Sequence, residues 1–179
     1  TVFTADEIAA YYNAHKADFK LDRTIVKGRI VRFTEGYRQA AKLKTLMASK
    51  SEAQQQDFRD ICEKNDFTVS DFRDQWVDFT DFLSYLPTPR SQSYDPLLAS
   101  TAVQEMRDSH SHYFFQIEDV RREGEPIPPE RLRGTIRRIL FNQRQGEIIR
   151  RHEEELCARA AENGEVKIFG DERAENEDN

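Results

Sequence analysis

The segment SHSHYFFQIEDV, residues 109–120, alternates in the manner of a β-strand and decides how the chain folds. Residues 102–108, AVQEMRD, also have the composition of a strand, and a short Ser-His-Ser turn joins the two segments. Together they predict a hairpin, so an antiparallel sheet is expected at the centre of the fold. Successive side chains of a strand point to opposite faces. One face should carry Tyr113, Phe115 and Ile117, and the other Phe114, Gln116 and Glu118.

A second strand is predicted at residues 24–33, TIVKGRIVRF, which are rich in β-branched residues. Gly28 lies inside this strand, which is typical of a bulge or of a close backbone approach. Helical periodicity follows at 37–48 and 52–64, and a short strand is expected around residues 75–77, QWV. This order of elements predicts an α+β fold, a small antiparallel sheet with covering helices.

Two further helices are predicted to flank the sheet. The first, within residues 3–19, begins with a capping box formed by Thr4 and Glu7. The second runs from about residue 129 to 162, roughly 50 Å long. It carries an apolar stripe longer than a small domain can cover, so we expect contacts with residues 3–19 and with a further partner. The stripe consists of Leu132, Ile136, Ile139, Leu140, Ile148, Ile149, Leu156 and Ala160.

These elements divide the protein into four expected parts. Residues 1–20 form an N-terminal connecting helix, and residues 21–125 form the sheet domain. Residues 126–169 hold the long helix and a short strand, EVKIF, at its end. Residues 170–179 contain five acids and one base, a composition that predicts a disordered acidic tail.

The composition excludes some classes of partner. The protein has a net charge of −6 and no excess of basic residues, so we expect no nucleic-acid partner. No apolar run approaches the roughly 20 residues of a membrane span. Because the sequence begins at Thr1 without Met, we expect a fragment or a mature form, with membrane association only through an N-terminal anchor outside it. Cys62 and Cys157 form no CxxC pattern, and whether they pair stays open.

The histidines are the first candidates for catalytic or metal-binding residues. His110 and His112 lie two positions apart, which could place two imidazoles on one face of a strand. Nothing in the sequence brings a third ligand to them from His15, His152, a cysteine or a carboxylate. We therefore expect no metal site. The sequence also lacks the motifs of phosphate-binding loops, dinucleotide-binding folds, zinc proteases and serine hydrolases, so no cofactor is expected.

Three stretches together resemble a known family: residues 6–33, residues 74–79 (DQWVDF), and residues 112–156, which begin HYFFQIEDV. Their order and spacing are similar to those of the parvulin-type (PpiC/SurA/PrsA-like) peptidyl-prolyl isomerases and foldases of bacterial envelopes, above all a divergent Bacteroidetes-type set. The similarity covers about residues 1–169. It implies a parvulin-like domain at 21–125 and a location in the periplasm or at the cell envelope.

The active-site histidines of that family are replaced here. The triplet that matches the "HIL" pattern of the first parvulin strand is Arg29-Ile30-Val31. The histidine of the last strand falls on Tyr113, and His112 lies one position early, on the opposite face. The glycine-rich "GGDLGW" segment is reduced to residues 73–76, which keep an aromatic residue, Trp76, but lose the glycines. The resemblance therefore implies a degenerate active site.

The resemblance implies a protein-folding factor that binds unfolded or proline-containing polypeptides with little or no isomerase chemistry, so no catalytic residue is expected. The alternative is an active peptidyl-prolyl cis-trans isomerase with a rearranged site made of Tyr113, His112 and Arg29. A third hypothesis is an assembly module that docks a partner helix on the stripe of residues 129–162. Clients and oligomeric state stay open. The expected peptide-binding residues are Trp76, Phe79, Phe82, Tyr113 and Phe115.

Overall fold

The computed structural model describes residues 2–88 and 93–162. Contacts within the protein separate two compact units. Phe19–Ile127 form the sheet unit, and the segments up to Asp18 and from Pro128 form the helical unit. The strand expected at 165–169 and the acidic tail expected at 170–179 lie outside the described residues.

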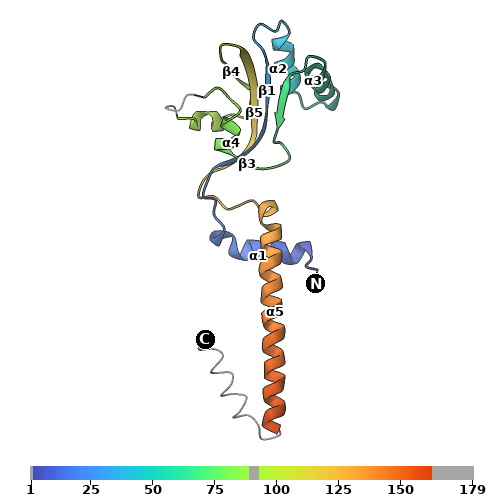
Figure 1. The fold of residues 1–179 in the computed structure, drawn as a ribbon, viewed down its shortest axis with the longest axis vertical. Helices are drawn as coiled ribbons and strands as arrows, with labels where there is room; N and C mark the ends of the chain where they lie inside the picture. Colours follow the sequence, from blue (N-terminus) through green and yellow to red (C-terminus); the bar gives the residue numbers. More distant parts are fainter. Residues whose placement is uncertain (1, 89–92, 163–179) are drawn as a thin grey trace. The chain divides into compact units, whose positions relative to one another are not determined.

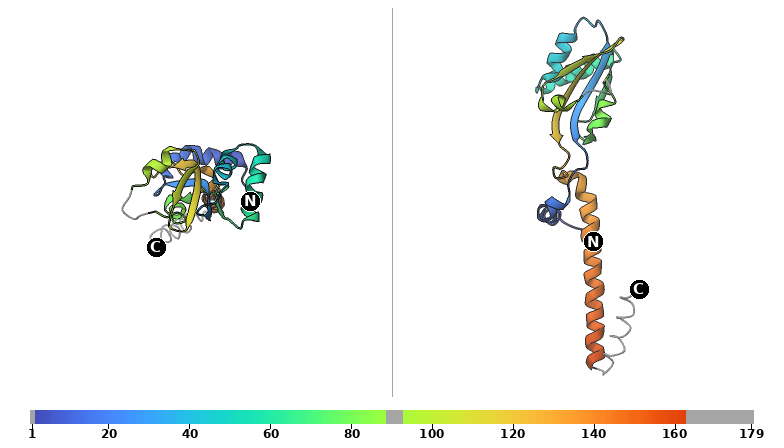
Figure 2. Two further views of the ribbon diagram at one scale, coloured as in Figure 1. Left: turned by 90° about the horizontal axis from the view of Figure 1, so that it is seen from above. Right: turned by 90° about the vertical axis from the view of Figure 1, so that its left-hand side faces the viewer.

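The sheet unit is built on an antiparallel sheet of five strands (Figure 1). β1 (Ile25–Thr34) pairs with β5 (Ser111–Arg121), and the two run side by side in the right-hand view of Figure 2. β2 (Thr68–Asp71) and the two-residue β3 (Val77–Asp78) pair with the other edge of β1, while β4 (Gln104–Arg107) pairs with β5. The predicted hairpin and the α+β fold class are confirmed.

Gly28 allows β1 and β5 to pair along their length. The register shifts between Lys27 and Gly28, which marks a β-bulge. A Cβ atom on residue 28 would lie 2.2 Å from the carbonyl oxygen of Gln116. The backbone of Gly28 also exchanges two hydrogen bonds with Phe72, at 3.3 and 2.7 Å. Only glycine leaves enough space for this approach of backbone segments.

Each face of the sheet has its own apolar core. α4 (Phe79–Leu83) and the short 3-10 helix η2 (Asp95–Ala99) pack on one face. α2 (Ala40–Ala48) and α3 (Glu52–Lys64) pack on the other, and Figure 1 shows this pair and α4 on different sides of the strands. The alternation of β5 divides its residues as predicted. Tyr113, Phe115 and Ile117 belong to the first core, and Phe114 belongs to the second.

The strand predicted around residues 75–77 overlaps β3, which begins at Val77 and pairs with β1. The sequence pattern does not predict β2, which makes the longer pairing with β1 through Thr68–Asp71. Three of these four residues are exposed, so the segment has no apolar side to reveal it as a strand. Its place in the sheet depends on backbone pairing with β1, which no short-range pattern encodes.

The helical unit contains α1 (Ala5–His15), the short 3-10 helix η1 (Lys16–Asp18) and α5 (Pro129–Glu162), and α5 has the predicted bounds. The Thr4 hydroxyl accepts a hydrogen bond from the backbone N–H of Glu7 at 3.1 Å, which confirms the predicted cap. α1 packs on α5, whose Leu132 and Ile136 are buried. Farther along α5, the stripe residues Ile148 and Ile149 are 53% and 57% exposed, and Phe141, beside the stripe, is 42% exposed. Among the described residues, no helix is long and apolar enough to cross a bilayer.

Candidate functional site

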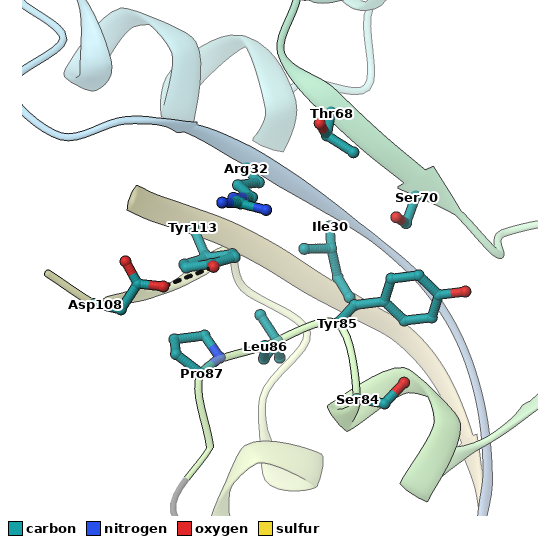
Figure 3. Close-up of a pocket in the computed structure, with 10 residues that line it drawn as sticks. All are labelled: Ile30, Arg32, Thr68, Ser70, Ser84, Tyr85, Leu86, Pro87, Asp108 and Tyr113. Carbon is teal, nitrogen blue, oxygen red and sulfur yellow. Dashed lines mark hydrogen bonds between the residues drawn. The ribbon is translucent and has the colours of Figure 1, made fainter. Parts of the chain in front are cut away.

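A cavity of about 320 Å³ lies on the face of the sheet that carries Tyr113 (Figure 3). We call it the Tyr113 pocket. Its volume is at the lower end of the roughly 300–1,000 Å³ that small-ligand pockets occupy. Strand residues line it from one side and the segment Ser84–Pro87, which follows α4, lines it from the other. Residues that line the pocket include Ile30, Arg32, Tyr85, Leu86, Asp108 and Tyr113.

The pairing register explains which strand residues meet at the pocket. Arg32 of β1 pairs with Thr68 of β2 and with Tyr113 of β5. Two positions earlier in β1, Ile30 pairs with Ser70 and with Phe115. Residues two apart on a strand share a face, so these two rows form one continuous surface. The pocket therefore combines residues from three strands that are distant from one another in the sequence.

Tyr113 is held in place by the turn that precedes β5. Its hydroxyl donates to Asp108 Oδ2 at 2.9 Å, as Figure 3 shows. The backbone N–H groups of His110 and Ser111 donate to Asp108 Oδ1 at 2.9 and 2.7 Å. These amide donors hold the pKa of Asp108 below its ordinary value. Burial first, and then the bond to Asp108, raise the pKa of Tyr113, so the phenol is a neutral hydrogen-bond donor near pH 7.

Arg32 is the basic residue of the pocket. Its Nε donates to the Ser111 hydroxyl at 3.0 Å, and its side chain is otherwise exposed. The pocket thus has one guanidinium, one carboxylate, two phenols and three aliphatic hydroxyls beside the apolar side chains of Ile30, Leu86 and Pro87. None of these groups has an ordinary pKa near 7, which a general acid or base at neutral pH requires. The arrangement is suited to binding rather than to proton transfer.

Arg29 lies on the opposite face of the sheet from this pocket. It is 2% exposed, its Nη2 donates to the Met47 carbonyl at 2.9 Å, and its guanidinium carbon lies 4.5 Å from the centroid of the Phe58 ring. Burial first, and then the charge of Arg73, lower the pKa of Arg29. These contacts connect β1 to α2 and α3, so Arg29 has a structural role in the sheet unit.

His112 also points away from Tyr113, as the alternation along β5 requires. Its ring lies 4.5 Å from that of Phe33 and 5.0 Å from that of Phe114, measured between centroids. Its Nε2 lies 2.7 Å from Glu105 Oε2 and 3.4 Å from Arg107 Nε. The structure therefore does not bring Tyr113, His112 and Arg29 together in one site.

Most of the aromatic residues expected to bind peptide are part of the core. Phe82 and Phe115 are fully buried, and Phe79 is 9% exposed. Of the five, only Tyr113 lines the pocket. Trp76 is half-buried, with Lys27 Nζ at 4.9 Å and the Arg121 guanidinium at 5.1 Å from its ring centroid. Its cation–π contacts hold three segments of the sheet unit together.

The remaining histidines do not gather with other ligand types. His15 stacks on Tyr11 in α1, His110 is exposed in the β4–β5 turn, and His152 is exposed on α5. Within residues 2–88 and 93–162, no three His, Cys, Asp or Glu side chains are close enough to hold a metal ion.

A second cavity, of about 570 Å³, is lined by residues of a different kind. Lys50, Arg73 and Glu118 contribute charged groups to it, and Gln55 and Gln116 contribute amides. Arg73 is already paired with Asp71 at 2.7 Å. This cavity contains none of the aromatic residues expected to bind peptide, whereas the Tyr113 pocket combines apolar and polar walls.

Several residues of the Tyr113 pocket are absent from the sequence prediction. The turn before β5 brings Asp108 to the pocket, and the pairing register of β1 brings Arg32 there. Tyr85 and Leu86 line the pocket because the segment after α4 returns to this face of the sheet. Alternation along β1 does place Arg32 on the same face as Ile30. No signal in the sequence indicates that residues 84–87 return to this face.

No protein-family model and no curated protein matches the sequence. A solved structure is similar to it with a TM-score of 0.37 and 11% sequence identity. That structure comes from work on the virulence factor PEB4 and the periplasmic protein Cj1289, two structurally related SurA-like chaperones of Campylobacter jejuni. The alignment covers 87% of the present protein and only 61% of that one.

Proposed function

We propose that the protein is a folding factor of the bacterial envelope that binds unfolded or proline-containing polypeptides with little or no isomerase chemistry. The observation that carries the proposal is the Tyr113 pocket, a cavity with apolar and polar walls at the strand position where the parvulin-type family has a histidine. The periplasmic or envelope location rests on the sequence resemblance alone.

The order of elements supports this proposal. The protein runs helix, strand, two helices, two short strands, short helix, hairpin and long helix, which differs by one short strand from the order that the resemblance implies. In the pocket, Ile30 and Leu86 are buried and offer apolar contacts, while the rim residue Tyr85 is 49% exposed. Such a surface suits a short extended segment that places one apolar side chain in the cavity. Phe79, Phe82 and Phe115 would support it from the core.

Binding is favoured over catalysis because of the groups that the pocket contains. Rotation about an X-Pro bond has a barrier of about 18–20 kcal/mol, which an isomerase must lower by desolvation and hydrogen bonding. The pocket has no imidazole, and Tyr113 Oη is already bonded to Asp108. In a proline-peptide isomerisation assay we therefore expect the uncatalysed rate. A clear acceleration would favour the alternative of an active isomerase with a rearranged site.

Client binding is tested by suppression of aggregation. Chemically denatured lysozyme is diluted into buffer with the full-length protein, and light scattering is followed. We expect suppression at an equimolar ratio. Tyr85→Ser should raise the concentration needed for half-suppression about fivefold, since losing one exposed aromatic contact costs on the order of 1 kcal/mol.

Val69→Ser is the matched control for this experiment. Val69 is 40% exposed and lies in β2 between two pocket residues, Thr68 and Ser70, so its side chain points to the opposite face. This variant should behave like the unmodified protein. The proposal fails if the unmodified protein has no effect on aggregation, or if both variants weaken suppression equally.

A further inference from the structure

Arg32 has a hydrogen-bonding capacity that the fold does not use. Its Nε is engaged by the Ser111 hydroxyl at 3.0 Å, which fixes the direction of the guanidinium plane. Its two terminal nitrogens make no hydrogen bond to any residue within the described ranges 2–88 and 93–162. Figure 3 shows the guanidinium beside the Tyr113 ring, on the row that Thr68, Arg32 and Tyr113 form across the sheet.

Asp108 does not satisfy this guanidinium. Its carboxylate accepts three hydrogen bonds, from the backbone N–H groups of His110 and Ser111 and from the Tyr113 hydroxyl. These donors belong to the turn and to β5, so the Asp108 carboxylate is oriented toward the turn and β5. Arg32 and Asp108 interact only as charges at a distance. The pocket therefore keeps a planar pair of N–H donors that is open to a ligand.

The chemistry beside Arg32 limits which ligand fits. Two terminal N–H groups in one plane match the two oxygens of a carboxylate, and such paired bonds are stronger than bonds between neutral groups. Next to them, Ile30, Leu86 and Pro87 form an apolar surface. A segment that presents a carboxylate close to an apolar or proline side chain would use both parts of the pocket.

We propose that the Tyr113 pocket selects polypeptide segments in which a carboxylate lies beside an apolar or proline residue, and that Arg32 is the residue that determines this preference. This inference rests on the proposed client binding. The carboxylate belongs either to an acidic side chain or to the C-terminus of a polypeptide, which offer the same two oxygens to the guanidinium.

The test uses fluorescently labelled peptides and the full-length protein, with binding followed by anisotropy at low ionic strength. The reference peptides contain Ala, Leu and Pro with a single Gln, and both of their ends are blocked. In the acidic set, Glu replaces this Gln at each position in turn. A third set keeps Gln but has a free C-terminal carboxylate. We expect the best carboxylate peptide to bind about tenfold more tightly than its neutral counterpart.

Variants of Arg32 separate recognition from a structural role. Arg32→Gln should remove the preference for the carboxylate, so that the acidic and the neutral peptide bind this variant with equal affinity. Arg32→Lys should keep part of the preference, since it retains the charge but loses the planar pair of donors. Arg38→Gln removes the same charge from an exposed residue that does not line the pocket, and it should keep the full preference.

The possible outcomes distinguish the proposed client binding from the proposed preference for a carboxylate. A preference for only the Glu set or only the free C-terminus identifies the source of the carboxylate and supports the inference. Equal binding of acidic and neutral peptides overturns the inference but leaves client binding intact. If no peptide binds, client binding at this pocket fails, and the inference fails with it. A preference that survives Arg32→Gln would also overturn the role of Arg32.

Discussion

At the scale of single residues, the sheet depends on Gly28 and the candidate site on the division between Tyr113 and its neighbours. Gly28 brings the backbones of β1 and β5 into contact at the bulge. Tyr113 lines the pocket, whereas His112 and Arg29 take part in contacts on the other face. One position along a strand is enough to separate a residue that lines the pocket from one that packs on the opposite face of the sheet.

Gly28→Ala should lower the free energy of unfolding by about 2 kcal/mol or more, because its Cβ would overlap the backbone of Gln116. Urea unfolding followed by circular dichroism measures this. The control is Gly134→Ala in α5, where an added Cβ meets nothing within 4 Å. That variant should keep or slightly increase helix stability, by about 0.5–1 kcal/mol. Equal stability of both variants would contradict the role of the bulge.

The contact between Glu105 and His112 predicts a pH dependence of stability. The hydrogen bond to His112, and then the charges of Lys44 and Arg107, hold the pKa of Glu105 below its ordinary value of 4.5. A carboxyl whose pKa is lowered by folding stabilises the fold above its unfolded pKa, and this contribution disappears as the pH falls through its folded pKa.

Glu105→Gln should therefore cost stability above about pH 5, and the difference from the unmodified protein should shrink below pH 4.5. Because the Glu105 side chain is 45% exposed, we expect less than about 1 kcal/mol. Urea midpoints measured from pH 7 to pH 3 test this. Glu63→Gln, an exposed α3 residue with no ion-pair partner in the described part of the protein, should show no such trend. A difference that is constant with pH would rule out the coupling.

At the scale of elements, the connection between α2 and α3 depends on one buried amide. Gln55 of α3 donates from Nε2 to the carbonyl oxygens of Leu46 and Met47 at 3.1 and 3.2 Å, and also to that of Ser49. These carbonyls lie at the C-terminal end of α2, where the Ser49 N–H also donates to the Leu46 carbonyl and Arg29 Nη2 to the Met47 carbonyl. Gln55 therefore satisfies the end of one helix from the next.

Gln55→Leu should destabilise the sheet unit by about 1–2 kcal/mol, because the carbonyl groups of Leu46, Met47 and Ser49 each lose a hydrogen-bond donor. Gln56→Leu is the matched control: Gln56 is exposed, and its amide bonds only to Asp60 and Arg59 on the same helix. The control should stay within about 0.5 kcal/mol of the unmodified protein. Chemical denaturation measures both variants, and similar unfolding midpoints for the two would show that the cap is dispensable.

At the scale of the whole molecule, the protein has two compact units, and the first and last residues of the sheet unit lie next to each other. The backbone N–H of Ile127 donates to the Phe19 carbonyl at 2.8 Å, and that of Leu21 donates to the Glu125 carbonyl at 2.8 Å. The two ends of Phe19–Ile127 are thus hydrogen-bonded to each other. Such a segment has the features of an independent domain.

Residues 19–127 should therefore fold when expressed alone. We expect a cooperative urea transition and a well-dispersed NMR spectrum, because both cores of the sheet unit lie within this segment. A segment from residue 25 to 121 retains all five strands but lacks these end hydrogen bonds, so it should be less stable. If residues 19–127 stay unfolded, the sheet unit depends on the helical unit.

The sequence alone was sufficient for the elements whose residues repeat with a clear period. Alternation in residues 112–120 predicted β5 and the assignment of its side chains to two faces, and the caps and apolar stripe predicted α1 and α5. Local periodicity determines these features because burial of one face requires it.

Tertiary structure determined which residues form the pocket, because local sequence patterns do not encode contacts between distant segments. The register of β1 against β2 and β5 brought Arg32, Thr68 and Tyr113 into one row, and the end of α4 returned Tyr85 and Leu86 to the same face. The side chains of the pocket come from strands and turns that are far apart in the sequence. Pairing between distant strands selects these neighbours, and that selection depends on the packing of the whole sheet unit.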